Sequence, residues 1–187
     1  MSITPRRRPN AEYRSREFLT EQEVDGLVRV ARKNRWGHRD STMILVAFRH
    51  GLRVSELIDM RWDQVDFCTA TLHVRRVKQG VSGDHSIDAD EFRALRRLRR
   101  EQEPKSPYVF TSERGTPFAT SGFAMIMARA GVAAGLPFKA HPHMLRHACG
   151  YAMEIKGKDI RATQAHLGHR MINSTVRYVQ TKPLIAA

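Results

Sequence analysis

Three histidines and an arginine lie within seven residues in the segment HPHMLRH, residues 141–147. Pro142 suits the first position of an α-helix, because the N–H that proline lacks would have no intrahelical partner there. His143 and Arg146 then lie three residues apart on one helix face, near the end where unpaired N–H groups and the helix dipole attract an anion. A guanidinium and an imidazole at this end are suited to hold a phosphate group.

Two other interpretations of this segment stay open from the residues alone. His143 and His147 are four residues apart and could chelate one metal ion. However, no carboxylate follows in an HExxH-like arrangement, and Arg146 would place a fixed positive charge beside the metal. The third interpretation is a polar helix end without a function. We expect the phosphate site, and we predict neither a bound metal nor any other cofactor.

Three further places in the chain carry residues suited to the same chemistry. In RHGLRVSEL, Arg53 lies two residues after a glycine and begins a predicted helix, with Glu56 one turn later. In RRVKQG, Lys78 lies at the mouth of a predicted hairpin. In HLGHRMINSTVRYVQ, His169 lies at a predicted helix end, and Tyr178 follows on a short helix. Taken singly, each of these residues is more often a surface or packing residue than a site residue.

Together, these residues resemble the catalytic pattern of the tyrosine recombinases, the phage-integrase family. That pattern is an arginine in G-[LM]-R-x-S-E, a hairpin lysine, H-x-x-R, a histidine in L-G-H, and a tyrosine just beyond. The matching residues are Arg53, Lys78, His143, Arg146, His169 and Tyr178. The segments RHGLRVSEL and HPHMLRHACGY are most similar to those of the small recombinases that invert fimbrial phase-switch elements. The resemblance implies a site-specific recombinase that inverts, excises or integrates a DNA element.

The resemblance also implies roles for the residues that contact the phosphate. Tyr178 would attack phosphorus and form a 3′-phosphotyrosyl link, which keeps the bond energy so that rejoining needs no ATP. Arg53 and Arg146 would hold the non-bridging oxygens, and His169 would add a hydrogen bond to them. The two arginines would do the electrostatic work that Mg²⁺ often does, so the reaction is expected to be independent of metal.

In this interpretation, two further side chains transfer protons and two others hold the catalytic residues in position. His143 would accept the phenolic proton, and Lys78 would protonate the leaving 5′ oxygen. Glu56 is expected to orient Arg53 or to cap its helix. His147 is expected to support the same site by ordering its neighbours.

The net charge of +13, from 32 Lys and Arg against 19 Asp and Glu, points to a polyanionic partner, and we predict double-stranded DNA. One basic cluster lies at the N-terminus, where it is expected to follow DNA phosphates or enter a minor groove. Its arginines are Arg6, Arg7, Arg8, Arg14 and Arg16. A second cluster, residues 92–100, is interpreted as the solvated face of a helix, because Phe92, Leu95 and Leu98 form an apolar stripe.

The periodicity of the chain predicts a mostly helical α+β fold with one small antiparallel sheet. Alternation in DFCTATLHVRRV, followed by a glycine-containing turn, predicts the strands of that sheet. Capping boxes are predicted at Thr20 with Glu23 and at Asp88 with Glu91.

The predicted organisation is a single domain with short flanking segments. A basic arm spans residues 1–17, the recombinase catalytic domain spans 18–180, and a short tail spans 181–187. The tail is expected either to pass between subunits or to be a frayed end. The resemblance implies a homotetramer on two duplexes and allows DNA-bending accessory proteins.

Composition excludes several other classes of protein. No apolar run reaches the length of a membrane span, and the N-terminus lacks an apolar signal segment, so no membrane partner is expected. Cys68 and Cys149 cannot form a disulfide framework. These features predict a cytoplasmic, nucleoid-associated protein.

Two alternative functions stay open. One is strand nicking and resealing by a monomer, as in type IB topoisomerases. The other is a DNA-binding regulator with an idle recombinase site. The intact set of catalytic residue types argues against an idle site, because a binding protein would not need a phenol at that position.

Overall fold

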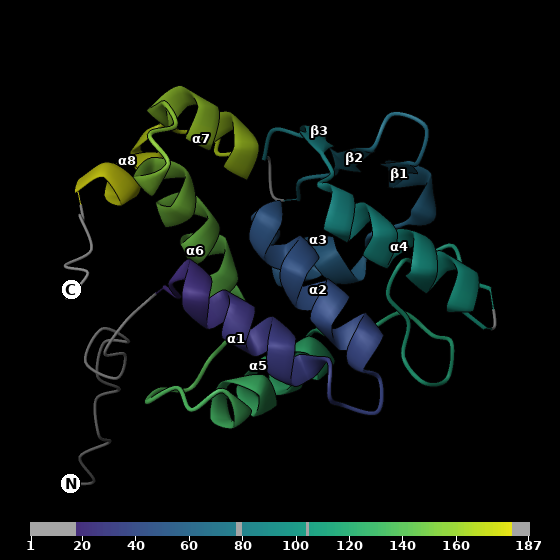
Figure 1. The fold of residues 1–187 in the computed structure, drawn as a ribbon. Coiled ribbons are helices and arrows are strands. Elements are labelled where there is room, and N and C mark those ends of the chain that lie inside the picture. The colour runs from purple at the N-terminus through teal and green to yellow at the C-terminus, as the bar shows by residue number, and fades with distance from the viewer. Residues whose placement is uncertain (1–17, 78–79, 104, 181–187) are drawn as a thin grey trace, which may run out of the picture.

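The computed structural model describes residues 18–77, 80–103 and 105–180 of the chain. Within these ranges it is built from α-helices and a small three-stranded sheet (Figure 1). The helices are α1 (Glu21–Ala31), α2 (Gly37–Arg49), α3 (Val54–Ile58), α4 (Ala89–Glu101), α5 (Thr120–Ala133), α6 (Pro142–Ile155), α7 (Ile160–Leu167) and α8 (Asn173–Gln180). The strands are β1 (Val65–Asp66), β2 (Thr71–Val74) and β3 (Gly83–Ser86). The predicted α+β fold is confirmed.

One of the two predicted capping boxes forms. Thr20 Oγ1 accepts a hydrogen bond from the Glu23 backbone N–H at 3.2 Å, and Glu23 Oε2 accepts one from the Thr20 N–H at 2.8 Å. The capping box predicted for Asp88 and Glu91 is wrong, because the Asp88 side chain makes no capping bond. Glu91 is instead fully buried, and its Oε1 lies 2.8 Å from His50 Nε2.

The antiparallel sheet covers one side of the core. Its strand order is β1-β2-β3, and Leu72 of β2 pairs with Val65 on one side and with His85 on the other. Leu72 and Val74 are buried, while His73 between them is exposed and lies 2.6 Å from Asp84. The alternation predicted from the sequence therefore sets which face of β2 packs inward.

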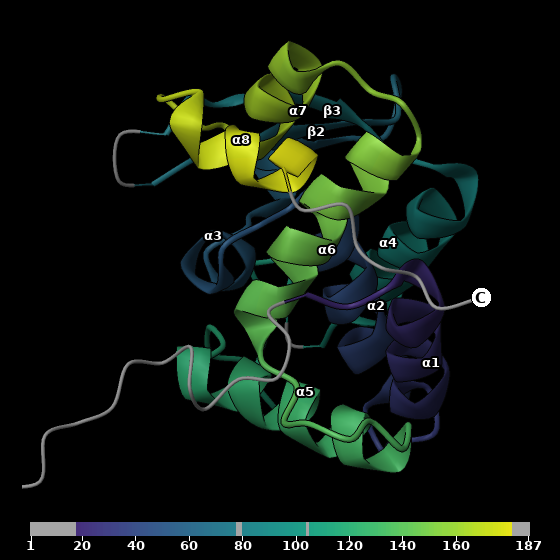
Figure 2. The ribbon, with the colours of Figure 1, turned by 90° about the vertical axis from the view of Figure 1, so that its left-hand side faces the viewer.

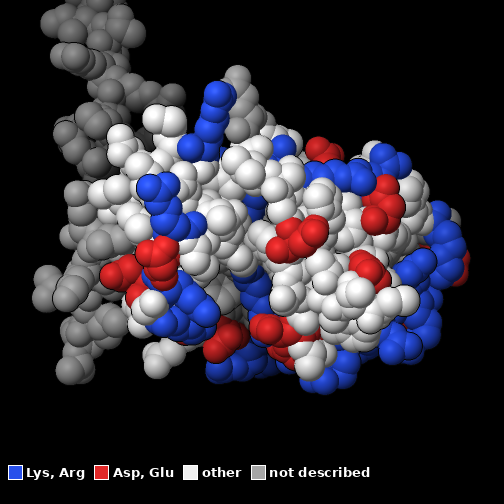
Figure 3. Space-filling view, turned by 90° about the horizontal axis from the view of Figure 1, so that it is seen from above, with Lys and Arg blue, Asp and Glu red and all other residues white. Residues whose placement is uncertain are grey.

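Helix α4 separates an apolar stripe from a basic face. Leu95 and Leu98 are buried and Phe92 packs against the core, as the sequence predicts. The exposed arginines of this helix are Arg93, Arg96, Arg97, Arg99 and Arg100. In Figure 3, Lys and Arg side chains gather at the right-hand edge of the molecule, on the side of α4.

Helix α6 links the two parts of the helical core. It packs against α1 and α2 on one side and against α7 and α8 on the other (Figures 1 and 2). The main core includes residues of α1, α2, α4, α5 and α6. A smaller cluster consists of Cys149, Tyr151, Leu167 and Tyr178. Over the part of the chain that the structure describes, no helix is long and apolar enough to cross a membrane.

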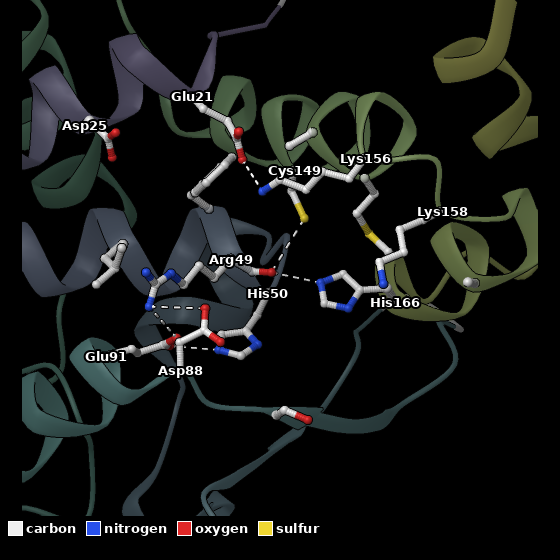
Figure 4. Close-up of a pocket in the computed structure, with 16 residues that line it drawn as sticks. Glu21, Asp25, Arg49, His50, Asp88, Glu91, Cys149, Lys156, Lys158 and His166 are labelled. Atoms are coloured by element: carbon white, nitrogen blue, oxygen red, sulfur yellow. Dashed lines mark hydrogen bonds and ion pairs between the residues drawn. The ribbon is translucent and has the colours of Figure 1, made fainter.

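Imidazole rings from three elements pack together where the sheet meets the helices. His50 Nδ1 lies 3.1 Å from His85 Nδ1, and the His85 and His166 rings stack with centroids 4.1 Å apart. His166 Nε2 lies 2.8 Å from the Arg49 carbonyl oxygen. Figure 4 shows His50, Glu91 and His166 at the wall of a cavity of about 690 Å³ between α1, α2, α6 and α7.

Because of these buried rings, we predict that the folded protein becomes less stable in mild acid. Burial, followed by the neighbouring positive groups, lowers the pKa of His85 to about 2 and that of His166 to about 4. Below about pH 6.5 the unfolded chain binds protons that the folded chain does not, so stability falls as the pH falls. We expect the free energy of unfolding in urea, followed by circular dichroism, to decrease from pH 7 to pH 5.

The contribution of one ring is tested with His85→Asn. Removing one such proton-binding group should flatten the pH dependence by up to about 1.4 kcal/mol per pH unit. An equal slope in the variant and the wild type would show that His85 does not resist protonation in the folded state.

Candidate active site

Arg53 is placed by the sharp turn between α2 and α3. Gly51 ends α2 with a φ of 55°, a left-handed conformation that favours glycine, and Arg53 is the N-cap of α3. Glu56 Oε2 accepts a hydrogen bond from the Arg53 backbone N–H at 3.0 Å, and its Oε1 accepts one from Arg53 Nη1 at 2.7 Å. Glu56 therefore caps the helix and orients the guanidinium, so both expected roles are observed.

Arg146 lies on α6 and is almost fully buried, with 2% of its surface exposed. Its Nη1 donates to the Gly51 carbonyl at 2.5 Å, and its Nη2 donates to the Leu167 carbonyl at 2.7 Å. These carbonyls lie at the C-terminal ends of α2 and α7, where the helix dipoles favour a cation. Burial, then the charges of Arg53 and Arg76, lower the pKa of Arg146 to about 10. The guanidinium still carries its charge at neutral pH.

Two predicted histidines lie beside the arginines. The His143 ring packs edge-on against His147, with centroids 4.5 Å apart, and its pKa is lowered by burial and then by Arg146. His169 follows the left-handed C-cap of α7, and its Nδ1 lies 2.9 Å from Thr175 Oγ1 on α8. Burial and then Arg146 lower the pKa of His169 to about 4. Both rings are therefore neutral at pH 7, so each can accept or donate a proton through its two nitrogens.

The Tyr178 side chain packs against α6 and is buried. A Cβ atom added at Gly150 would lie 2.6 Å from Cζ of the tyrosine, so only glycine leaves room for the ring. Tyr151 contacts the ring edge-on, and the His169 ring lies parallel to it with centroids 6.5 Å apart. The hydroxyl lies 3.3 Å from His147 Nδ1. Burial raises the pKa of Tyr178 to about 12, against the opposing effect of Arg146, so the seated phenol is protonated.

The described part of the site carries an excess of positive charge. Arg53, Arg76 and Arg146 lie close enough to one another to affect the pKa of Arg146, and Glu56 is the carboxylate among them. Three guanidiniums against one carboxylate leave a charge that a bound anion would balance. The structure thus brings the predicted Arg53, Glu56, His143, Arg146, His169 and Tyr178 to one site, together with His147.

Some predicted residues lie outside the described ranges. These are Lys78 and the arm residues Arg6, Arg7, Arg8, Arg14 and Arg16. Sequence reasoning missed Arg76, which contacts Glu56 and is 1% exposed. The signal was present, since Leu72, Val74 and Arg76 share one face at a spacing of two residues. An arginine at the end of that row was simply not expected to point inward.

His143 and His147 do not belong to a recognisable metal site. Among residues 18–77, 80–103 and 105–180, no three His, Cys, Asp or Glu side chains are arranged to hold a metal ion. His147 instead lies next to the phenolic oxygen. Its ring is neutral at pH 7, because burial and then the neighbouring His143 lower its pKa to about 3.

A family model described as the phage integrase family matches residues 17–183 of this chain. The chain belongs to the phage integrase family. It is a site-specific tyrosine recombinase, an enzyme that cleaves and rejoins DNA strands.

Two similar relatives are regulatory proteins of type 1 fimbriae in Escherichia coli K12. Type 1 fimbriae regulatory protein FimE is 38% identical over 168 residues, covering 87% of this chain and 85% of FimE. Type 1 fimbriae regulatory protein FimB is 36% identical over 172 residues, covering 90% of this chain and 86% of FimB. The predicted resemblance to the fimbrial recombinases is therefore confirmed.

Solved recombinase structures share this fold. The crystal structure of XerA recombinase aligns with a TM-score of 0.77 at 28% identity. The alignment covers 88% of this chain and 60% of the XerA chain, so this chain spans less than two thirds of the solved one.

The packing of the Tyr178 ring against Gly150 can be tested by adding one methyl group. In Gly150→Ala, the added Cβ collides with the Tyr178 ring, so we expect α8 to be displaced and its amide hydrogens to exchange faster. The gain of about 1 kcal/mol that alanine usually brings inside a helix should be absent.

Gly26→Ala in α1 is the matched control, because its Cβ would meet only Ala134 Cβ, at 4.0 Å. That variant should become more stable by about 0.5–1 kcal/mol. Equal gains in both variants, with unchanged exchange in α8, would show that the phenol is not seated over Gly150.

Proposed function

We propose that this recombinase cleaves DNA with Tyr178 as the nucleophile and with Arg53 and Arg146 as the groups that bind the scissile phosphate. The observation that carries the proposal is the uncompensated positive charge beside a buried phenol. Two guanidinium groups that are held in place before the substrate binds can stabilise a pentavalent phosphorus without reorganising. A bound DNA phosphate would supply the missing counter-charge.

In the proposed reaction the phenolic oxygen attacks phosphorus and the bond to the 5′ oxygen breaks. The products are a 3′-phosphotyrosyl link and a free 5′-hydroxyl, and the reverse reaction rejoins a strand. His143 accepts the phenolic proton, and Lys78 gives a proton to the leaving oxygen. His169 donates a hydrogen bond to a non-bridging oxygen.

The protonation states of the described residues support these roles. A neutral His143 can take up a proton, whereas an imidazolium could not. Because the seated phenol has a pKa of about 12, its proton must leave as the attack proceeds. His147 also lies beside the proposed nucleophile, since its Nδ1 is 3.3 Å from the phenolic oxygen.

The proposed partner is double-stranded DNA on the chromosome, bound by four copies of the chain across two duplexes. The excess of Lys and Arg supports a polyanionic partner. Among the structures that share the fold, XerH recombinase is described as bound to its difH substrate, and lambda integrase as a dimer bound to a core site. In this proposal residues 1–17 contact DNA, and DNA-bending proteins assist assembly.

Covalent trapping tests the nucleophile. On a nicked copy of its recombination site, the wild type should form a protein–DNA adduct that survives SDS and EDTA. Tyr178→Phe should form none and still bind the DNA in a mobility-shift assay, because it loses only the attacking oxygen.

The remaining outcomes of this assay separate the alternatives. Absence of an adduct with the wild type would favour the DNA-binding regulator with an idle site. Relaxation of supercoiled DNA without a recombination site would favour the topoisomerase-like function. Loss of the adduct in EDTA would show that a metal takes part.

The role of Arg53 in binding phosphate predicts a large effect on rate. Arg53→Ala should slow single-turnover cleavage by about 100- to 1,000-fold, as removal of one transition-state donor does in other enzymes. Arg49→Ala is the matched control, because Arg49 lies on α2 and donates to Asp90, at 2.6 and 2.9 Å, rather than to Glu56. Similar rates for both variants would contradict the assignment of Arg53.

A further inference from the structure

Arg76 is a buried arginine that the catalytic pattern does not include. It follows β2 by two residues and continues the inward-facing row of that strand. Only 1% of its side chain is exposed.

The guanidinium of Arg76 joins three parts of the chain. Its Nη1 donates to Glu56 Oε2 at 2.8 Å and to the Gly51 carbonyl at 3.2 Å. Its Nη2 donates to the carbonyls of His50, at 2.9 Å, and of His166. Both terminal nitrogens therefore donate to acceptors of the protein.

These acceptors are shared with both phosphate-binding arginines. The Glu56 carboxylate accepts from Arg53 through Oε1 and from Arg76 through Oε2. The Gly51 carbonyl accepts from Arg76 and from Arg146. A substitution of Arg76 would therefore change the position of Arg53 through the shared carboxylate and that of Arg146 through the shared carbonyl.

Arg76 also lies between the β2–β3 hairpin and the end of α7. The Val77 N–H donates to Glu56 Oε1 at 3.3 Å, and the Val81 N–H donates to the Gly168 carbonyl at 3.2 Å. A Cβ added at Gly168 would lie 2.7 Å from Arg76 Cγ, so this glycine lets the chain before His169 pack over the arginine. Both sides of the hairpin are thus tied to segments that carry site residues.

We propose that Arg76 is a positioning residue of the recombinase, which orients Arg53 through Glu56 and Arg146 through the Gly51 carbonyl. The proposal rests on the roles given above to Arg53 and Arg146. Arg76 acts through its fork of donors, because a single ammonium group cannot serve acceptors on three segments at once.

Single-turnover cleavage of the nicked substrate tests this role. Arg76→Gln should slow cleavage by about 100-fold, the loss expected when reacting groups move by about 1 Å. Affinity for DNA should change little, since the side chain is buried. Arg75→Gln is the matched control, because Arg75 is exposed and its Nη2 donates to Asp63 at 3.3 Å.

A double-mutant cycle separates positioning from general loss of stability. If Arg76 acts through Arg53, then Arg53→Ala should cost much less in the Arg76→Gln protein than in the wild type. A variant that is merely less stable would give additive losses. Additive losses, or cleavage by Arg76→Gln within about threefold of the wild type, would overturn the proposal.

Arg76→Lys keeps the test decisive if the glutamine variant does not fold. It retains the buried charge opposite Glu56 and loses the fork, so it should also cleave more slowly and show the same non-additivity with Arg53→Ala. Wild-type rates and additive losses in this variant would overturn the proposal. The wild type in the same assay reports on the chemistry itself, because failure of its adduct would reject the proposed nucleophile and not the role of Arg76.

Discussion

The active site depends on two helix ends whose carbonyl groups need donors. The last turn of a helix leaves carbonyl oxygens without partners, and here the ends of α2 and α7 meet inside the protein. Arg146 donates to Gly51 and Leu167, and Arg76 donates to His50, Gly51 and His166. The two guanidiniums satisfy these carbonyls and join α2, α6, α7 and the hairpin. The same bonds fix the charges that the reaction needs.

Without a bound substrate, the buried guanidiniums destabilise the folded protein. Burying a guanidinium removes its hydration, and like charges within one site repel each other. The lowered pKa of Arg146 and of the neighbouring His169 reflects both effects. Glu56 offsets part of the charge, and a phosphate would offset more. The fold thus maintains a site that is complementary to an anion and is poorly balanced in its absence, which is the condition for electrostatic preorganisation.

The proposed nucleophile is subject to an opposing constraint. Tyr178 belongs to a small apolar cluster with Cys149, Tyr151 and Leu167, and its ring needs the space left by Gly150. Burial holds the phenol in place and also keeps it protonated. The phenolic oxygen therefore needs a base to take its proton when a phosphate is bound, because its buried position alone does not activate it.

The sequence by itself determined the order of the residues proposed for catalysis, the fold class and several of the helix starts. Local patterns carry this information: Thr20 and Glu23 cap α1, Pro142 begins α6, and the alternation of Leu72 and Val74 sets the face of β2. A capping box or an alternating strand is specified by residues that are neighbours in the chain.

Only the tertiary structure decided which partner each buried polar group takes. Glu91 had the spacing of a cap but pairs with His50, which is 41 residues away. His147 lies against Tyr178 across 31 residues, and Arg146 reaches Gly51 across 95. A buried charge or carbonyl must find a partner wherever packing brings one, and sequence spacing does not encode that distance. These long-range pairings set how the side chains around the proposed phosphate site are arranged.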